Sequence, residues 1–370
     1  MSIKLGSFSI LLSYFLLNSN AFAQDKVPVV ASFSVLGDLV KQVGGEHVSV
    51  TTLVKANGDA HVYNPAPKDA KAVKHAKLLV TNGLAFEGWM PRLLESTKFT
   101  GVSVVASSGI TPLKNEDDHD ADHEDEHHDE HEAHDAEHDD EHHDEHEAHD
   151  ADHDDDHHDE HKGHDDDHDD EHHDEHKGHD DDHDEHEDHH AHHHGEFDPH
   201  AWHSINNAKV YVQNIANGLS QVDTAHRATY QQNAAQYIQK LEQLEVELTA
   251  KIKRIPLAER NVLTPHDAFG YLARDFKINF IAPQGTGTDT EASAADVAKI
   301  IKQIRKQHIK AVFLENITDN RIVEQISRET HSSIGGKLYS DALSNDNEPA
   351  STYLKMMCYN LETIVKGLSH

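Results

Sequence analysis

Three histidines and one aspartate stand in short loop motifs where they could bind a metal ion together. His61 lies in "GDAHVYNPAP", His200 in "FDPHAWHS", His266 in "TPHDAFGYL" and Asp341 in "LYSDALS". These motifs are predicted to lie in loops after strands, which is where α/β sheets place their ligand sites. Three imidazoles and one carboxylate would fill the tetrahedral shell of a zinc ion. Spacing alone cannot assemble them, because they lie far apart in the sequence, and a single loop histidine is more often simply exposed.

Most of the other histidines belong to one biased tract, residues 117–194. About 28 of the 38 histidines of the chain lie there, and residues 116–196 hold about 42 acids and only two lysines. Two blocks of the tract recur after fifteen residues, but with no apolar side chain larger than Ala the tract cannot bury a core, so we expect it to be solvated and disordered. Dense imidazole beside dense carboxylate predicts that it collects additional, weakly held ions, zinc and also nickel or copper. A solvated charge spacer is the alternative interpretation.

The net charge of −36 comes from this tract, because the rest of the chain is close to +4. The tract would be repelled by phosphate and the rest shows no basic stripe, so no binding to nucleic acid is expected. The single Cys358 cannot form an intramolecular disulfide, so folding must rest on buried apolar surface.

In the sequence outside the tract, β-branched strand segments alternate with amphipathic helical segments. This pattern predicts an α/β fold with two lobes, each a mostly parallel sheet flanked by helices. Strands are expected at 27–33, 48–54, 77–83, 102–107, 261–266, running into a loop, and 311–316. The segment 336–344 is expected to carry a strand that ends at Asp341. Helices are expected at 34–45, 67–76, 87–97, 224–255, 267–276, 292–308, 320–332 and 351–368. The helix at 224–255 has apolar residues every three or four positions and stops at Pro256, so we expect one long, rigid helix that joins the lobes.

The N-terminus is typical of a secretory signal. A positive Lys4, an apolar run and the small-x-small pattern "AFA" precede Gln24. The run is too short to span a bilayer, and no cysteine stands at the expected cleavage point. A free periplasmic monomer, neither lipid-anchored nor embedded in a membrane, is therefore expected. The predicted division is a signal peptide at 1–23, a first lobe at 24–116, the tract at 117–194, the rest of the first lobe at 195–223, the linking helix at 224–255 and a second lobe at 256–370.

Four segments, "HVYNPAPKD", "FDPHAWHS", "TPHDAFGYLARDF" and "GKLYSDALS", resemble in this order the signature segments of the ZnuA-like and AztC-like zinc receptors of bacterial ABC importers, the cluster A-I family. The resemblance covers essentially the mature chain, and a His-rich insert is itself typical at this place. It implies two lobes joined by one long helix, with the metal in the cleft between them. The implied ligands are His61, His200, His266 and Asp341, although some members leave the fourth position to water or a loop carboxylate. The disulfide that such zinc receptors often carry in the second lobe cannot form here.

The resemblance implies a high-affinity extracytoplasmic receptor that delivers Zn²⁺ to an ABC permease and its ATPase subunit. Whether a periplasmic zinc chaperone is a further partner that loads the site stays open. Manganese receptors of the superfamily place a carboxylate where His266 stands, and three nitrogens with one oxygen suit zinc better than manganese. A storage protein dominated by the tract is the alternative from another class. An enzyme is not expected, because four protein ligands leave no position for a catalytic water.

Three neighbours of the proposed ligands carry expectations of their own. His203 is expected to face solvent or to bond a ligand, Asp59 to lie in a solvated turn or to reinforce the site, and Asp267 to orient the imidazole of His266. Metal binding is expected to weaken as the pH falls through about 6.5, where imidazoles take up protons.

Overall fold

The structure is a computed structural model that describes residues 25–115, 195–307, 309 and 311–369. The predicted signal peptide and the His-rich tract lie outside these residues. Among the described residues, no helix combines the length and the apolar character that crossing a bilayer requires.

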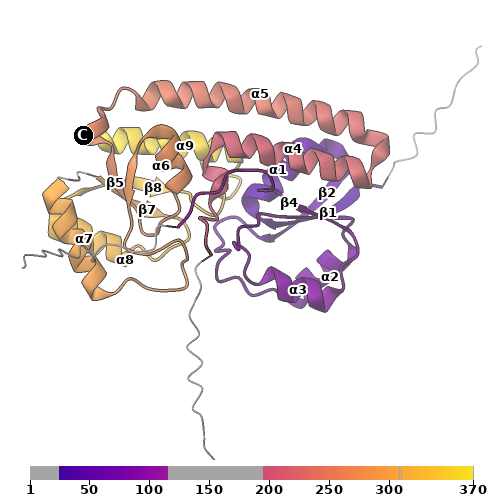
Figure 1. Ribbon diagram of the computed structural model, residues 1–370, viewed down its shortest axis with the longest axis horizontal. Helices are drawn as coiled ribbons and strands as arrows, with labels where there is room; N and C mark the ends of the chain where they lie inside the picture. Colours follow the sequence, from indigo (N-terminus) through magenta and orange to yellow (C-terminus); the bar gives the residue numbers. More distant parts are fainter. Residues whose placement is uncertain (1–24, 116–194, 308, 310, 370) are drawn as a thin grey trace, which may run out of the picture. The chain divides into compact units, whose positions relative to one another are not determined.

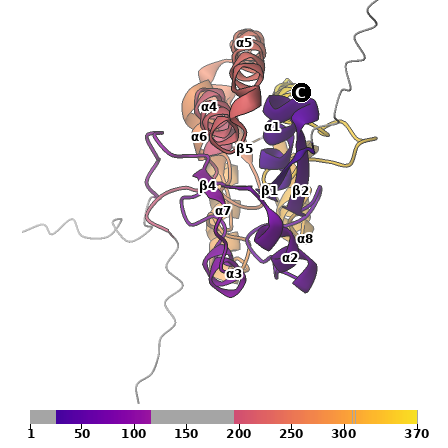
Figure 2. The same cartoon turned by 90° about the vertical axis from the view of Figure 1, so that its right-hand side faces the viewer.

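The first half of the chain forms a parallel sheet in the order β2-β1-β3-β4. Its strands are β1 (Val27–Phe33), β2 (Val48–Val54), β3 (Leu78–Thr81) and β4 (Val102–Val105). The helices of this half are α1 (Ser34–Gly44), α2 (Pro67–His75), α3 (Met90–Thr97) and α4 (Ile205–Val222). Helices α1 and α4 cover one face of the sheet, and α2 and α3 lie on the other (Figure 1, Figure 2). Because both faces are covered, apolar residues fill both sides of β1 and β3.

The second half repeats this plan with the order β6-β5-β7-β8, again parallel. Its strands are β5 (Asn261–Leu263), β6 (Asn279–Ile281), β7 (Ala311–Glu315) and β8 (Ser333–Leu338). Its helices are α6 (Gly270–Phe276), α7 (Ala294–Gln307), α8 (Arg321–Thr330) and α9 (Tyr353–Leu368). Figure 1 shows α6 and α9 on one side of this sheet and α7 and α8 on the other. The predicted two-sheet α/β fold is therefore confirmed.

The long helix α5 (Arg227–Ile252) joins the two halves. It packs against α1 in the first half and α9 in the second (Figure 1). Its buried residues are those of the predicted apolar stripe, Tyr230, Ala234, Tyr237, Leu241, Leu244, Leu248 and Ile252. The predicted long helix is confirmed, although residues 224–226 form a separate 3-10 turn before it.

Buried polar contacts also connect the halves close to the loops of interest. The indole Nε1 of Trp202 donates to the carbonyl of Ser340 at 3.0 Å, and the hydroxyl of Tyr353 donates to the carbonyl of Trp202 at 2.6 Å. Asp38 of α1 accepts from the backbone N–H of Tyr353, the first residue of α9, at 2.8 Å. The segment that precedes α4 is thus tied to both sheets.

Several predicted element boundaries were wrong in informative ways. Strand β5 ends at Leu263, three residues before the end of the predicted segment 261–266, and His266 lies in the loop after it, as predicted. Strand β6 was not predicted, because it has only three residues and begins at an exposed Asn279. Strand β8 begins at Ser333 and ends at Leu338, so Asp341 lies beyond the strand instead of ending it. The domain boundaries remain predictions.

Candidate metal centre

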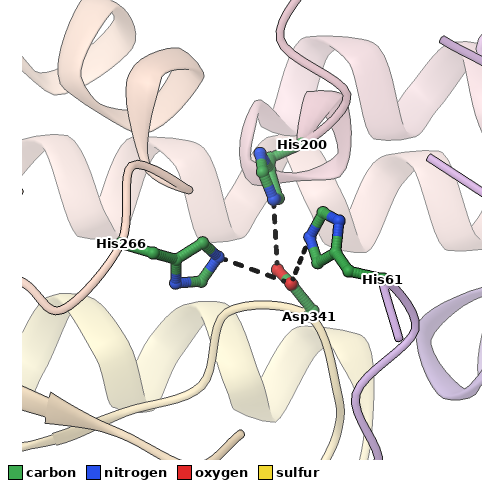
Figure 3. A group of neighbouring side chains, drawn as sticks. All are labelled: His61, His200, His266 and Asp341. Carbon is green, nitrogen blue, oxygen red and sulfur yellow. Dashed lines mark ion pairs between the residues drawn. The ribbon is translucent and has the colours of Figure 1, made fainter. Parts of the chain in front are cut away.

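His61, His200, His266 and Asp341 come from four separate segments and meet in one place (Figure 3). His61 lies in the loop after β2, and His200 immediately precedes the 3-10 turn Ala201–His203 that leads into α4. His266 follows β5, and Asp341 follows β8. Each offers one ligand atom, and these atoms all lie within 4.8 Å of one another. Two of the residues come from each half of the chain, so folding brings together what sequence spacing could not.

Asp341 lies at the centre of the group. Its Oδ2 lies 3.0 Å from Nε2 of His61 and 3.4 Å from Nε2 of His266, and its Oδ1 lies 3.5 Å from Nε2 of His200. His200, His266 and Asp341 are fully buried, and the side chain of His61 is 11% exposed. None of the three Nε2 atoms and neither oxygen of Asp341 has a hydrogen-bond partner among the described residues.

Unpartnered buried polar atoms are costly unless something else satisfies them. Here the atoms without a hydrogen bond are three ring nitrogens and two carboxylate oxygens, which face one another at ion-pair distances of 3.0–3.5 Å. A divalent cation with a preference for nitrogen and oxygen ligands fits this donor set. The residues present therefore suit a metal ion as cargo.

Two of the imidazoles are oriented by a buried carboxylate behind them. Asp198 Oδ1 lies 2.8 Å from Nδ1 of His200 and accepts the backbone N–H of that residue at 2.8 Å. Glu315 Oε2 lies 2.7 Å from Nδ1 of His266, and its Oε1 accepts the backbone N–H of His266 at 3.2 Å. A carboxylate at Nδ1 fixes the ring and leaves Nε2 available to a metal ion.

A carboxylate does lie behind the ring of His266, but it is not the expected Asp267. Asp267 is exposed, and the buried carboxylate at the ring of His266 belongs to Glu315 at the end of β7. Glu315 is itself fixed, because its Oε2 accepts from the hydroxyl of Ser340 at 2.6 Å. The sequence feature that could have identified Glu315 is its position as an acid at the end of the apolar strand segment "AVFLE".

The pattern Asp-x-His occurs twice at the site, and both copies form the same local turn. Asp198 accepts the N–H of His200, and Asp59 accepts the N–H of His61, each at 2.8 Å. An aspartate that accepts the N–H two residues later is a common turn device. Asp59 is half-buried and also accepts from the hydroxyl of Thr288 at 2.6 Å, so it is not merely a solvated turn residue.

An aromatic wall lies behind the first two histidines. The ring centroids of Phe33, Phe86 and Trp202 are 4.8–4.9 Å apart in every pair. Phe86 lies 4.9 Å from the ring of His61, and Trp202 lies 5.3 Å from that of His200. This apolar surface excludes water and strengthens every electrostatic interaction inside the site.

The charges of the site shift one another's pKa values. Burial opposes charge on all three buried groups, but the nearby charges of opposite sign outweigh it. The Asp341 carboxylate, with Asp198, raises the pKa of His200 to about 9. Glu315 and Asp341 raise the pKa of His266 well above its ordinary value, and the two imidazoles hold the pKa of Asp341 well below its own.

His203 differs from the expectation that it faces solvent. It is fully buried between Trp202 and Phe269, with ring centroids 5.6 and 4.7 Å away. Burial, with the nearby His200, lowers the pKa of His203 to about 3, so its ring is neutral at physiological pH. It is not a member of the four-residue group.

Comparison with known proteins now decides the family. The model of the family ZnuA, the periplasmic component A of the zinc-uptake complex, matches residues 29–367. The chain belongs to this family. ZnuA-family proteins are the periplasmic metal-binding components of ABC importers, so the protein is not an enzyme and works with a permease and an ATPase.

The individual relatives are named for different metals. The iron-binding protein YfeA of Yersinia pestis is 26% identical over 350 residues, which are 95% of this chain and 89% of YfeA. The manganese-binding lipoprotein MntA of Halalkalibacterium halodurans is 24% identical over 342 residues, 92% of this chain and 88% of MntA. The solved structure of the periplasmic zinc binding protein TroA from Treponema pallidum has a TM-score of 0.69 at 22% identity, covers 93% of this chain and 99% of TroA, and shows the shared fold.

The comparisons contradict the expectation of a protein without a lipid anchor. MntA and several streptococcal relatives are named lipoproteins. The expectation rested on the absence of a cysteine at the predicted cleavage point, and residues 1–24 lie outside the described part of the chain. An extracytoplasmic location agrees with the periplasmic family.

Proposed function

We propose that this ZnuA-family receptor binds Zn²⁺ with high affinity through His61, His200, His266 and Asp341 and delivers it to the permease. The observation that carries the proposal is the convergence of buried, unpartnered ring nitrogens and carboxylate oxygens within 4.8 Å of one another. Three imidazole nitrogens and one carboxylate match the borderline-soft character and the tetrahedral preference of zinc.

Manganese is the second candidate, and two observations favour it. Some relatives are named for manganese. Both oxygens of Asp341 also face imidazoles, so a two-oxygen contact would supply five donors to a larger, harder ion. Affinity alone does not identify the cargo, because most sites of this kind bind zinc more tightly than manganese.

The cargo is therefore tested by delivery as well as by binding. In a bacterial strain that lacks its own receptor, we expect the chain to restore growth in zinc-depleted medium and not in manganese-depleted medium. The His266→Asp variant replaces one nitrogen donor with oxygen, so its ratio of zinc to manganese affinity is expected to fall. Rescue only in manganese-depleted medium would make manganese the cargo.

We propose that the His-rich tract is an accessory collector of weaker ions and that the four-residue site does not depend on it. Deleting residues 117–194 is expected to leave one tight zinc ion per chain, measured by calorimetry, while the weaker sites disappear. The deletion can be closed with a short Gly-Ser linker, because the flanking segments pair with each other. Asn115 N–H donates to the carbonyl of Glu196 at 3.1 Å, and Asp198 N–H donates to that of Leu113 at 2.9 Å.

The matched variant for this test is His200→Ala in the full chain, which keeps the tract and removes one ligand of the site. We expect it to lose the tight ion and to keep the weaker ones. If the tight ion disappears with the tract instead, a storage protein becomes the better explanation. The monomeric state and a periplasmic zinc chaperone remain predictions, and light scattering of the zinc-loaded chain tests the first.

A further inference from the structure

His61 is held differently from the other two histidines. Asp198 lies behind the ring of His200 and Glu315 behind that of His266, but no described carboxylate other than Asp341 lies at ion-pair distance from His61. His61 is also the one ligand candidate that is partly exposed. The position of its imidazole therefore depends on the turn that carries it, residues 57–61.

This 57–61 turn is tied to the second half of the chain by hydrogen bonds at Asn57 and at Asp59. The hydroxyl of Thr288 donates to Asp59 Oδ2 at 2.6 Å, while the other oxygen of Asp59 accepts the N–H of His61. The backbone N–H of Asn57 donates to the carbonyl of Leu343 at 2.9 Å. Leu343 lies two residues after Asp341, so this bond connects the segments of two ligand candidates.

The side chain of Asn57 adds two more contacts across the same boundary. The amide of Asn316 donates to Asn57 Oδ1 at 3.1 Å, and Asn57 Nδ2 donates to Glu348 Oε2 at 3.1 Å. Asn57 has a φ of 55°, a left-handed conformation that asparagine tolerates better than most residues. A local bond from Gly58 N–H to the carbonyl of Lys55 at 3.0 Å completes the turn. The geometry of the turn thus depends on partners in the other half.

We propose that Asn57 and Thr288 are positioning residues that hold the 57–61 turn against the second half and so set the rate at which the metal leaves. The proposal rests on the function proposed above. When these bonds break, His61 can move away from the ion with its turn, while His200 and His266 stay fixed by their own carboxylates. Release then begins at His61, and anything that separates the turn from the loops at Thr288 and Leu343 accelerates it.

The test measures zinc release directly, by mixing the zinc-loaded full chain with an excess of a coloured chelator in a stopped-flow instrument. Thr288→Val deletes the hydroxyl donor and keeps the shape of the side chain. Asn57→Gly deletes both side-chain contacts and keeps a residue that accepts positive φ. Each variant is expected to release zinc about two- to tenfold faster, the effect of losing one or two hydrogen bonds. Thr288→Ser keeps the donor and should release zinc at the wild-type rate.

Thr330→Val is the matched control, because the Thr330 hydroxyl donates at 2.7 Å within its own helix α8. It should not change the release rate, and the melting temperature of the zinc-free protein should be alike in Thr288→Val and this control. Release at the wild-type rate in both Thr288→Val and Asn57→Gly, or equal acceleration in Thr288→Ser, would overturn the proposal. A wild-type chain that holds no tight ion would instead overturn the proposed function, and this inference with it.

Discussion

We expect zinc binding at pH 7 to release about two protons per ion from this protein, because a metal can bind only to neutral imidazoles. Without an ion, burial disfavours charge on His200, but Asp341 and Asp198 raise its pKa to about 9. The pKa of His266 is raised well above its ordinary value by Glu315 and Asp341. Both rings therefore carry protons at pH 7 and must lose them when they bind zinc.

The exchange of two protons for one Zn²⁺ suits a buried site, because two protons and one divalent ion carry the same charge. Placing an uncompensated charge among His200, His266 and Asp341, all fully buried, would be strongly unfavourable. Two leaving protons and one arriving Zn²⁺ keep the total charge of the site unchanged. We therefore expect protons to take the place of the ion between rounds of transport.

Calorimetry in buffers with different ionisation enthalpies counts the released protons. Between pH 7 and the His200 pKa of about 9, zinc affinity should rise about a hundredfold per pH unit while both rings exchange a proton. This replaces the sequence-based expectation of a threshold near pH 6.5. Asp198→Asn removes one of the charges that raise the pKa of His200 and leaves the four ligand candidates in place, so fewer protons should be released. No proton release by the wild-type protein at pH 7 would contradict the pKa shifts.

Thermal unfolding of the zinc-free protein gives an independent check on the same protons. The pKa of His200 is higher in the folded state, about 9, than the ordinary value of 6.5. Its contribution to the free energy of unfolding is therefore complete below pH 6.5 and is lost as the pH rises through about 9. The melting temperature should fall over this window, and saturating zinc should remove most of the decrease, because the bound ion replaces the protons.

The strand and helix order was predictable where segments are long and regularly patterned. The apolar segment 27–33 could be predicted as a buried parallel strand because β-branched residues fill both of its faces. Helix α5 was predictable from its apolar stripe. Strand β6, with three residues, offers no periodicity to detect, and the end of β8 depends on pairing with β7 rather than on its own residues.

The site was predictable only in part. Loops carry no periodic pattern, so periodicity could not identify the ligand candidates. They could be selected only because their loop motifs resemble those of a family: His61, His200, His266 and Asp341. Glu315 could not be paired with His266 in this way, because 49 residues separate them. Leu263 pairs with Val312 across β5 and β7, so three residues further along, His266 and Glu315 reach the same level. The register between β5 and β7 therefore determines that Glu315, and not the adjacent Asp267, contacts the ring of His266. This register cannot be predicted from the sequence alone.

Replacing Glu315 with Gln is expected to weaken zinc binding about 10- to 100-fold, the usual cost of losing a carboxylate that orients a metal-bound histidine. Gln keeps the shape of the side chain but removes the charge 2.7 Å from Nδ1 of His266. The ring then becomes a less basic ligand, and its orientation is less well fixed. The affinity is measured by competition with a chelator of known strength.

Two further measurements separate this role from simple damage to the fold. Glu315 is the leading cause that raises the pKa of His266, so Glu315→Gln should also release about one proton fewer when zinc binds. The matched control is Asp267→Asn, which removes an exposed carboxylate next to His266 and should change neither the affinity nor the proton count. Equal loss of zinc affinity in both variants would mean that binding depends on the overall negative charge near the site. It would then not depend on the contact between Glu315 and the ring of His266. The proton count decides between the two, because only a carboxylate in contact with the ring can hold a proton there for zinc to displace.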